Sequence, residues 1–153
     1  MEERYGDLLK LGKAGEFDVI IHGCNCFNTM GAGIAKQVKS QFPEAYEADA
    51  RTKKGDKDKL GKYTKHEYAT NTECESLYVI NAYTQYAYWN AFDVDYDAIR
   101  SCFKALKEDF GGQNLRFGYP LIGCGLAGGN WDTVKAIIDE ELEGEDHTVV
   151  IFQ

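Results

Sequence analysis

The sequence predicts an α/β fold in three layers, with helices on both faces of a central mixed, largely parallel sheet. Short β-branched or aromatic runs, typical of strands, alternate with segments whose apolar residues recur every three or four positions, as in amphipathic helices. Two glycine-rich stretches each lie between such a strand and such a helix. The chain has 153 residues, 44% of them hydrophobic, so we expect one domain over residues 1–153.

The expected strands, in chain order, cover residues 1–11, 19–21, 63–68, 77–80, 115–117 and 147–152. The expected helices cover residues 34–42, 44–53 and 131–142, and a further one begins after Asp93 or Asp95 and ends at residue 110. Pro43 separates the first two helices, because proline ends one helix and suits the first position of the next. Residues 51–62 are rich in lysine, aspartate and glycine, which predicts a solvated loop.

Polar side chains before the last two helices suggest how these helices begin. Asp93 or Asp95 is expected to cap the third helix, and Asn130 to cap the fourth. The strongly aromatic residues 81–90 allow two interpretations: these rings stack on a base or sugar, or they cover the core.

The first glycine-rich stretch, residues 22–35, follows a buried strand and leads into a helix. Free amides of a first helical turn and the positive end of the helix dipole favour a bound phosphate, and glycines let the backbone approach it. Gly31-Ala32-Gly33 lacks the third glycine of a dinucleotide-binding loop and the Gly-Lys-Ser/Thr of a P-loop. A plain strand-to-helix turn is therefore the alternative.

The second glycine-rich stretch, residues 121–129, also lies between a strand and a helix. In a sheet of this kind, both stretches would open at the carboxyl ends of strands, where ligands bind. Two phosphate-sized sites on one sheet edge predict a ligand with a diphosphate or with several phosphate positions.

Composition excludes several partners. The net charge of −8 argues against a groove for long nucleic acid, and no apolar run approaches the ~20 residues of a membrane span, so we expect neither partner. Five irregularly spaced cysteines indicate reduced thiols in a cytoplasmic protein. Cys24 and Cys26 lack a second matched pair, so we expect no metal. We expect no cofactor and a monomer.

These features resemble the macrodomain family, whose members bind ADP-ribose. Gly6-Asp7-Leu8 is similar to the family's Gly-Asp-Ile/Leu, where the carboxylate accepts from the adenine amino group. The resemblance places Asn25 on the distal ribose, the two glycine-rich stretches around the diphosphate and Phe152 against adenine. The ligand it implies is ADP-ribose or ADP-ribose 1''-phosphate. The binding residues it implies are Asp7, Leu8, Gly23, Cys24, Asn25, Met30, Gly31, Ala32, Gly33, Ile34, Ala35, Ile122, Gly123, Cys124, Gly125, Leu126, Ala127 and Phe152.

Within the family, the sequence is most similar to the branch that dephosphorylates ADP-ribose 1''-phosphate, a by-product of tRNA splicing. The run from His22 to Cys26 matches that branch, as does the path from Ile122 to Trp131. The forms that remove ADP-ribose from protein glutamates carry a lysine and an acid, where this sequence has Asn81 and Ala127.

The expected reaction is hydrolysis of the 1''-phosphomonoester. Asn25 suits orientation of the distal ribose, loop amides suit the phosphate charge, and His22 is the candidate that positions or deprotonates water. A structural role for His22 is equally compatible with its place at a strand end. No arginine follows a cysteine at the spacing of a cysteine phosphatase. The alternatives are an ADP-ribosyl hydrolase acting on modified proteins or nucleic acid, and a non-catalytic reader of ADP-ribose.

Overall fold

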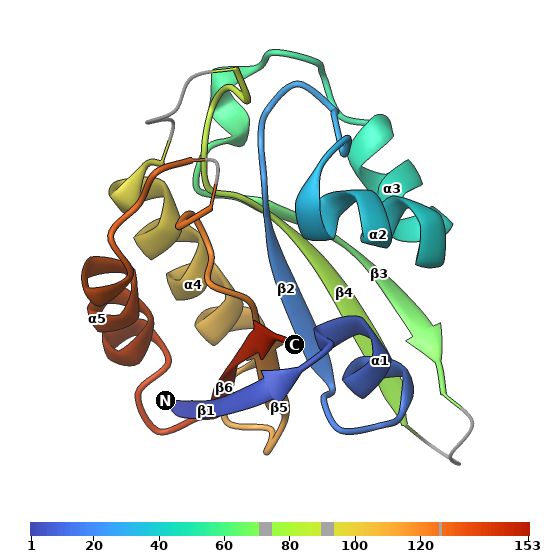
Figure 1. Cartoon of the computed structure of the whole chain (residues 1–153), viewed down its shortest axis with the longest axis vertical. Coiled ribbons are helices and arrows are strands. Elements are labelled where there is room, and N and C mark those ends of the chain that lie inside the picture. Colours follow the sequence, from blue (N-terminus) through green and yellow to red (C-terminus); the bar gives the residue numbers. More distant parts are fainter. Residues whose placement is uncertain (71–74, 90–93, 126) are drawn as a thin grey trace.

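The fold of the computed structural model is a three-layer α/β arrangement around one six-stranded sheet (Figure 1). The structure describes residues 1–70, 75–89, 94–125 and 127–153. The strands are β1 (Glu2–Gly6), β2 (Val19–Cys24), β3 (Tyr63–Ala69), β4 (Ser76–Tyr83), β5 (Arg116–Tyr119) and β6 (Asp146–Phe152). The helices are α1 (Leu8–Lys13), α2 (Gly33–Gln41), α3 (Pro43–Ala50), α4 (Tyr96–Phe110) and α5 (Trp131–Glu141), with a 3₁₀ turn, η1 (Lys57–Lys59).

The sheet order is β1-β6-β5-β2-β4-β3, and every neighbouring pair is parallel except β3 and β4. Helices α1, α2 and α3 cover one face, and α4 and α5 cover the other (Figure 1). Each face has its own apolar core, one built on Val38 and Phe42, the other on Ile99, Phe103 and Ile138. The predicted mixed, largely parallel sheet between helical layers is confirmed.

The prediction of a strand over residues 1–11 is wrong in its second half, where the chain forms α1. The Asp7 carboxylate accepts hydrogen bonds from the amides of Leu9 and Lys10, at 3.1 and 3.2 Å, and so caps this helix. Leu8 and Leu9 are buried on the side of the sheet that α1 covers. The residues after Asp7 therefore form a helix rather than a strand, because the Asp7 carboxylate satisfies the free amides at the start of α1.

Residues 51–62 are only partly the solvated loop that their composition predicts. Lys59, in η1, is 8% exposed, and its ammonium donates to Asn28 Oδ1 at 2.7 Å and to Thr52 Oγ1 at 2.9 Å. The segment is thereby fastened to the first glycine-rich stretch. Asp95 caps α4 by accepting from the amide of Ala98, whereas Asp93 lies outside the described residues.

Candidate functional site

Two adjoining cavities form one cleft at the edge of the sheet where β2 and β5 end. The first, which we call the inner pocket, has a volume of about 480 Å³, and the second, the outer pocket, about 640 Å³. They are continuous, because both are lined by Gly33, Ile34, Pro120, Leu121 and Gly125. The cleft thus passes between the two glycine-rich stretches.

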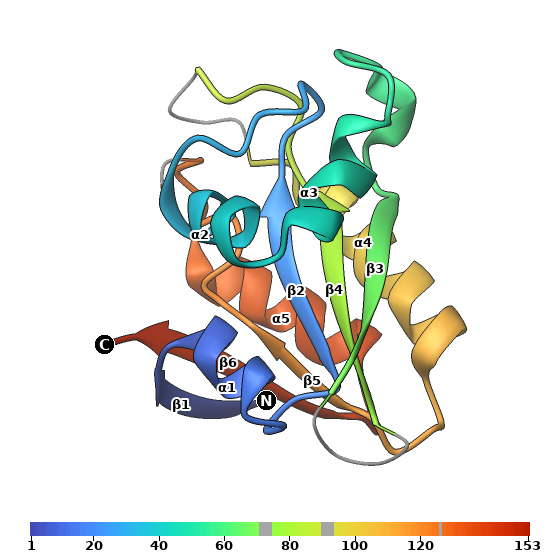
Figure 2. The ribbon, with the colours of Figure 1, turned by 90° about the vertical axis from the view of Figure 1, so that its right-hand side faces the viewer.

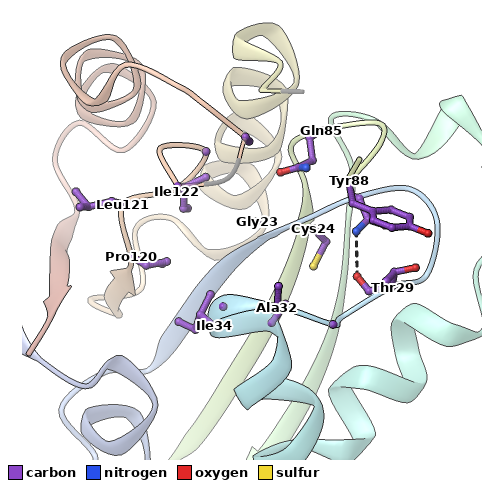
Figure 3. A pocket seen from close by; sticks show the side chains of 17 residues that line it. Gly23, Cys24, Thr29, Ala32, Ile34, Gln85, Tyr88, Pro120, Leu121 and Ile122 are labelled. Atoms are coloured by element: carbon purple, nitrogen blue, oxygen red, sulfur yellow. Dashed lines mark hydrogen bonds between the residues drawn. The ribbon is translucent and has the colours of Figure 1, made fainter. Parts of the chain in front are cut away.

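The inner pocket is lined by small, apolar or neutral polar side chains. Its lining consists of Gly23, Cys24, Asn25, Thr29, Gly31, Ala32, Gly33, Ile34, Ala35, Gln85, Tyr88, Pro120, Leu121, Ile122, Gly123, Gly125 and Ala127. Figure 3 shows Ile34 and Ala32 across the cavity from Ile122 and Gln85. No Asp, Glu, Lys, Arg or His belongs to this lining among the residues that the structure describes.

The first glycine-rich stretch is shaped by its own polar side chains. Asn25 donates from Nδ2 to the carbonyl of Thr29 at 2.9 Å, and its Oδ1 accepts from the amide of Phe27 at 2.8 Å. Asn28 adopts a φ of 56°, which asparagine tolerates better than most residues. Ala32, the residue before α2, makes no side-chain cap. The first amides of α2 are therefore left for an anion in the cleft.

The second glycine-rich stretch folds back on itself. Gly123 has a φ of 74°, and its carbonyl accepts from the amide of Gly129 at 2.7 Å. The amide of Cys124 donates to the carbonyl of Leu121 at 3.2 Å. These bonds close a compact wall opposite the start of α2. Leu126, which the resemblance assigns to the site, lies outside the described residues.

His22 does not line either pocket as the structure describes them. It is 2% exposed, and Nε2 lies 2.7 Å from Asn81 Oδ1. Asn81 donates from Nδ2 to the Ala45 carbonyl and to Thr64 Oγ1, so Oδ1 is the acceptor and His22 donates from Nε2. Burial lowers the pKa of His22 to about 4, against the smaller opposing effect of the Asn81 bond. The imidazole is therefore neutral near pH 7.

The thiols near the cleft are poor nucleophiles. Burial raises the pKa of Cys24, and its Sγ lies 3.6 and 3.7 Å from the two ring nitrogens of His22. Burial also raises the pKa of Cys26 to about 11 and that of Cys124 above its ordinary value. Thiolate chemistry near neutral pH is disfavoured at all three.

The outer pocket combines an apolar lining with one carboxylate. It is lined by Gly6, Asp7, Leu8, Leu9, Gly33, Ile34, Gln37, Pro120, Leu121, Cys124, Gly125, Val150, Ile151 and Phe152. Phe152 is 81% exposed, so its ring has an open face. Asp7 caps α1 with Oδ1 alone. Among the described contacts, Oδ2 has no hydrogen-bond donor and can accept one from a ligand.

Most of the described residues that the sequence assigned to the site line this cleft. The two exceptions are His22 and Met30. The side chain of Met30 is buried, with 3% of its surface exposed. The two cavities also include residues that sequence reasoning missed. Those of the inner pocket are Gln85 and Pro120, whereas Thr29 and Leu121 also line it and lie within the two predicted glycine-rich stretches. Those of the outer pocket are Gly6, Leu9, Gln37, Val150 and Ile151. Tyr88 belongs to the aromatic stretch for which stacking on a base or sugar was one interpretation.

Neither a metal site nor a membrane-spanning helix is seen in the described part of the chain. There, no group of three or more His, Cys, Asp or Glu side chains is placed to hold a metal ion. No helix of the same residues combines the length and apolarity that crossing a bilayer requires.

Comparison with known proteins identifies the family. The model of the Macro domain family matches residues 21–138, which is most of the chain. The chain belongs to the Macro domain family. This macrodomain is 40% identical over 138 residues to an uncharacterized 17.5 kDa protein from the tk-vs intergenic region of Enterobacteria phage T4. The match covers 88% of this chain and 84% of the phage protein.

Solved structures share the fold over nearly the whole macrodomain. A protein from Bacteroides thetaiotaomicron is 25% identical with a TM-score of 0.76, and the match covers 99% of both chains. DarTG from Thermosipho africanus, solved in complex with ADP-ribose, is 18% identical with a TM-score of 0.71. That match covers 99% of this macrodomain and 42% of DarTG.

Proposed function

We propose that this macrodomain binds ADP-ribose along the cleft. The observation that carries the proposal is the union of two cavities between two glycine-rich stretches. In this arrangement adenine occupies the outer pocket, the diphosphate lies against the start of α2, and the distal ribose enters the inner pocket. The ADP-ribose bound by the related DarTG supports the same ligand.

Backbone groups are the main source of attraction for the diphosphate. The lining of the cleft holds no lysine or arginine among the described residues, and the whole chain carries a net charge of −8. The uncapped amides of α2 and the dipole of this nine-residue helix supply the compensating positive potential. We expect the affinity to depend only weakly on salt, because fixed dipoles rather than exposed charges hold the ligand.

Asp7 provides the test of the binding mode. In Asp7→Asn the oxygen that caps α1 is kept, while the free Oδ2 becomes an amide that donates instead of accepting. Calorimetry with ADP-ribose and with its hypoxanthine analogue, which has a 6-oxo group, measures the consequence. The native protein should prefer adenine and the variant should prefer hypoxanthine, each by roughly 1–2 kcal/mol. An unchanged preference would remove Asp7 from adenine recognition.

Hydrolysis of ADP-ribose 1''-phosphate is a further proposal for the same site. It is favoured by the run His22-Gly23-Cys24-Asn25-Cys26, three residues of which line the inner pocket. We propose that Asn25 and loop amides orient the ribose and its phosphate. His22 is not proposed to exchange protons near neutral pH, because burial has lowered its pKa to about 4. Positioning of the attacking water then depends on neutral polar groups such as Thr29 and Gln85.

Turnover distinguishes the enzymatic proposals from simple binding. Purified protein is incubated with ADP-ribose 1''-phosphate and, separately, with an ADP-ribosylated protein and an ADP-ribosylated oligonucleotide. Release of phosphate supports the phosphatase, and release of ADP-ribose supports a hydrolase of modified macromolecules. Binding without either product identifies a reader.

A further inference from the structure

Strand β3 forms one of the two edges of the sheet. It is the last strand in the order β1-β6-β5-β2-β4-β3, and no described strand pairs with its outer side. Figure 2 shows β3 along its length on the side of the molecule that faces the viewer. The strand has seven residues, Tyr63–Ala69, and contains neither proline nor glycine. An exposed edge of this length offers a row of amides and carbonyls to another strand.

The ladder with β4 determines which backbone groups of β3 point outward. The amide of Tyr83 donates to the Lys62 carbonyl at 3.0 Å, and the amide of Thr70 donates to the Glu75 carbonyl at 3.3 Å. Lys62 and Thr70 therefore direct backbone groups toward β4. The even-numbered residues between them do the same, because these directions alternate along a strand. Residues 63, 65, 67 and 69 consequently direct their amides and carbonyls away from the sheet.

This alternation restricts how a second copy of β3 can pair antiparallel with the first across a two-fold axis. Outward-pointing residues must lie opposite outward-pointing residues, so the axis passes through a residue and not between two. With the axis at His66, Lys65 of each chain lies opposite Glu67 of the other, and all seven residues are paired. With the axis at Lys65 or at Glu67, that residue lies opposite its own copy and like charges meet. Charge complementarity thus selects one register.

The side chains of Lys65 and Glu67 are placed to meet a second copy. Both residues are exposed. The Lys65 ammonium lies 5.2 Å from the centroid of the Phe110 ring in α4, and Glu67, two residues on, lies on the same face of the sheet. The Glu67 carboxylate accepts from Ser76 Oγ at 2.6 Å and has further lone pairs for a cross-strand partner. Charged side chains normally protect an edge strand, but opposite charges that meet across two strands stabilise the pair.

We infer that this macrodomain self-associates through β3 into a two-fold dimer, in which the two six-stranded sheets become continuous. The dimer departs from the monomer that we expect from the sequence. Residues of β3 do not belong to the described lining of either pocket. Self-association and ADP-ribose binding can therefore be tested separately.

The other edge strand, β1, lacks an equally favourable register. The Gly6 carbonyl accepts from the amide of Gln153 at 3.1 Å, so the outward backbone groups of β1 belong to its odd-numbered residues. A two-fold axis must again pass through a residue. An axis at Glu2, Glu3 or Arg4 sets that charged residue opposite its own copy. Because like charges destabilise a pair of strands, β1 is the less suitable edge.

Charge reversal tests the interface and its register. Sedimentation equilibrium is measured from micromolar to millimolar protein at about pH 8, where imidazole side chains are uncharged. The native protein should approach twice the monomer mass. Lys65→Glu and Glu67→Lys should each weaken self-association by about tenfold or more, because both cross-strand charge pairs become repulsive. A native protein that remains monomeric at the highest concentration would overturn the inference.

Combining the two reversals provides the decisive comparison. In an equimolar mixture of Lys65→Glu and Glu67→Lys, one chain carries two acidic side chains at these positions and the other carries two basic ones. The mixture should therefore form heterodimers, and the double variant Lys65→Glu/Glu67→Lys should associate with itself as the native protein does. Recovery in both cases also shows that the variants are folded. Failure of both to recover would contradict the proposed register.

Two controls complete the design. Glu3→Lys makes the same charge change as Glu67→Lys at the exposed edge β1 and should leave self-association unchanged. If Glu3→Lys alone dissociates the dimer, the interface lies at β1 and the inference is wrong. Calorimetry should give Lys65→Glu the same affinity for ADP-ribose as the native protein. Failure of the native protein to bind ADP-ribose would refute the proposed function and leave the sedimentation result to decide the dimer.

Discussion

The side chain of Asn25 holds the loop that contains it, and it can also bind a ligand in the cleft. One of its amide hydrogens and one of its oxygen lone pairs are used within the loop, by Thr29 and Phe27. The remaining hydrogen and lone pair are free for a ribose hydroxyl. The resemblance to the macrodomain family assigned Asn25 to the site from its position in the sequence. The loop bonds depend on the path of the following four residues and could not be predicted from that position.

Two glycines of the cleft should respond differently to the same substitution. A Cβ added at Gly23 would lie 2.7 Å from Thr84 Oγ1, so Gly23→Ala should lower the free energy of unfolding by about 1–3 kcal/mol. A Cβ at Gly125 would meet no described atom within 4 Å and would enter the cleft. Gly125→Ala should therefore retain stability and weaken ADP-ribose binding. Denaturant unfolding and calorimetry on both variants check this, and equal loss of stability would contradict it.

His22 illustrates a limit of prediction at the residue scale. Its neighbours Gly23 and Cys24 line the inner pocket at the end of β2, but His22 lies further back along the strand and is paired in the sheet with Asn81. His22 accordingly points toward Asn81 and the layer of α3. The place of His22 beside Gly23 in the sequence thus indicated which strand ends at the cleft. The pairing of β2 with β4 determined the surroundings of the imidazole.

At the scale of elements, the first glycine-rich stretch depends on a segment that does not touch the cleft. Lys59 of η1 donates to Asn28 and Thr52, and its ammonium lies 5.4 Å from the Tyr83 ring centroid. Tyr83 in turn donates to Asp49 at 2.8 Å. Composition predicted a solvated loop here, since a lysine-rich segment is normally exposed. The partners of Lys59 account for its burial, and two of them, Asn28 and Tyr83, lie in other segments of the chain.

Lys59→Met should loosen the first glycine-rich stretch without removing any cleft residue. Loss of two charge-assisted hydrogen bonds leaves Asn28 less restrained, so we expect ADP-ribose binding to weaken by about 1–3 kcal/mol. Hydrogen exchange of residues 25–33 should become faster in parallel. Lys62→Met, an exposed position in the same segment, is the matched control and should change neither quantity. Unaltered exchange in the Lys59 variant would refute the proposed restraint.

At the scale of the whole molecule, His22 links stability to pH. Its pKa of about 4 in the folded protein is below the value of about 6.5 expected after unfolding, so the unfolded chain binds the proton first as pH falls. The free energy of unfolding should therefore decrease between about pH 6.5 and pH 4. Burial lowers the pKa of His147 as well, which acts in the same direction.

The variant His22→Gln isolates this contribution. Between pH 7 and pH 4 the native protein should lose about 3 kcal/mol more stability than the variant. Denaturant unfolding at several pH values measures the difference, and the contribution of His147 cancels because both proteins contain it. Parallel stability curves would mean that His22 is not held neutral by the fold.

By itself, the sequence determined the order of strands and helices, their placement in layers and the two glycine-rich stretches at one sheet edge. These follow from local signals, because periodicity and turn residues act over a few positions and parallel strands bring their carboxyl ends together. Tertiary structure decided that α1 replaces part of a strand, that Lys59 is buried, and that Gln85, Tyr88 and Leu121 meet around one cavity. Those outcomes depend on contacts between distant segments, which determine each side chain's burial and partners.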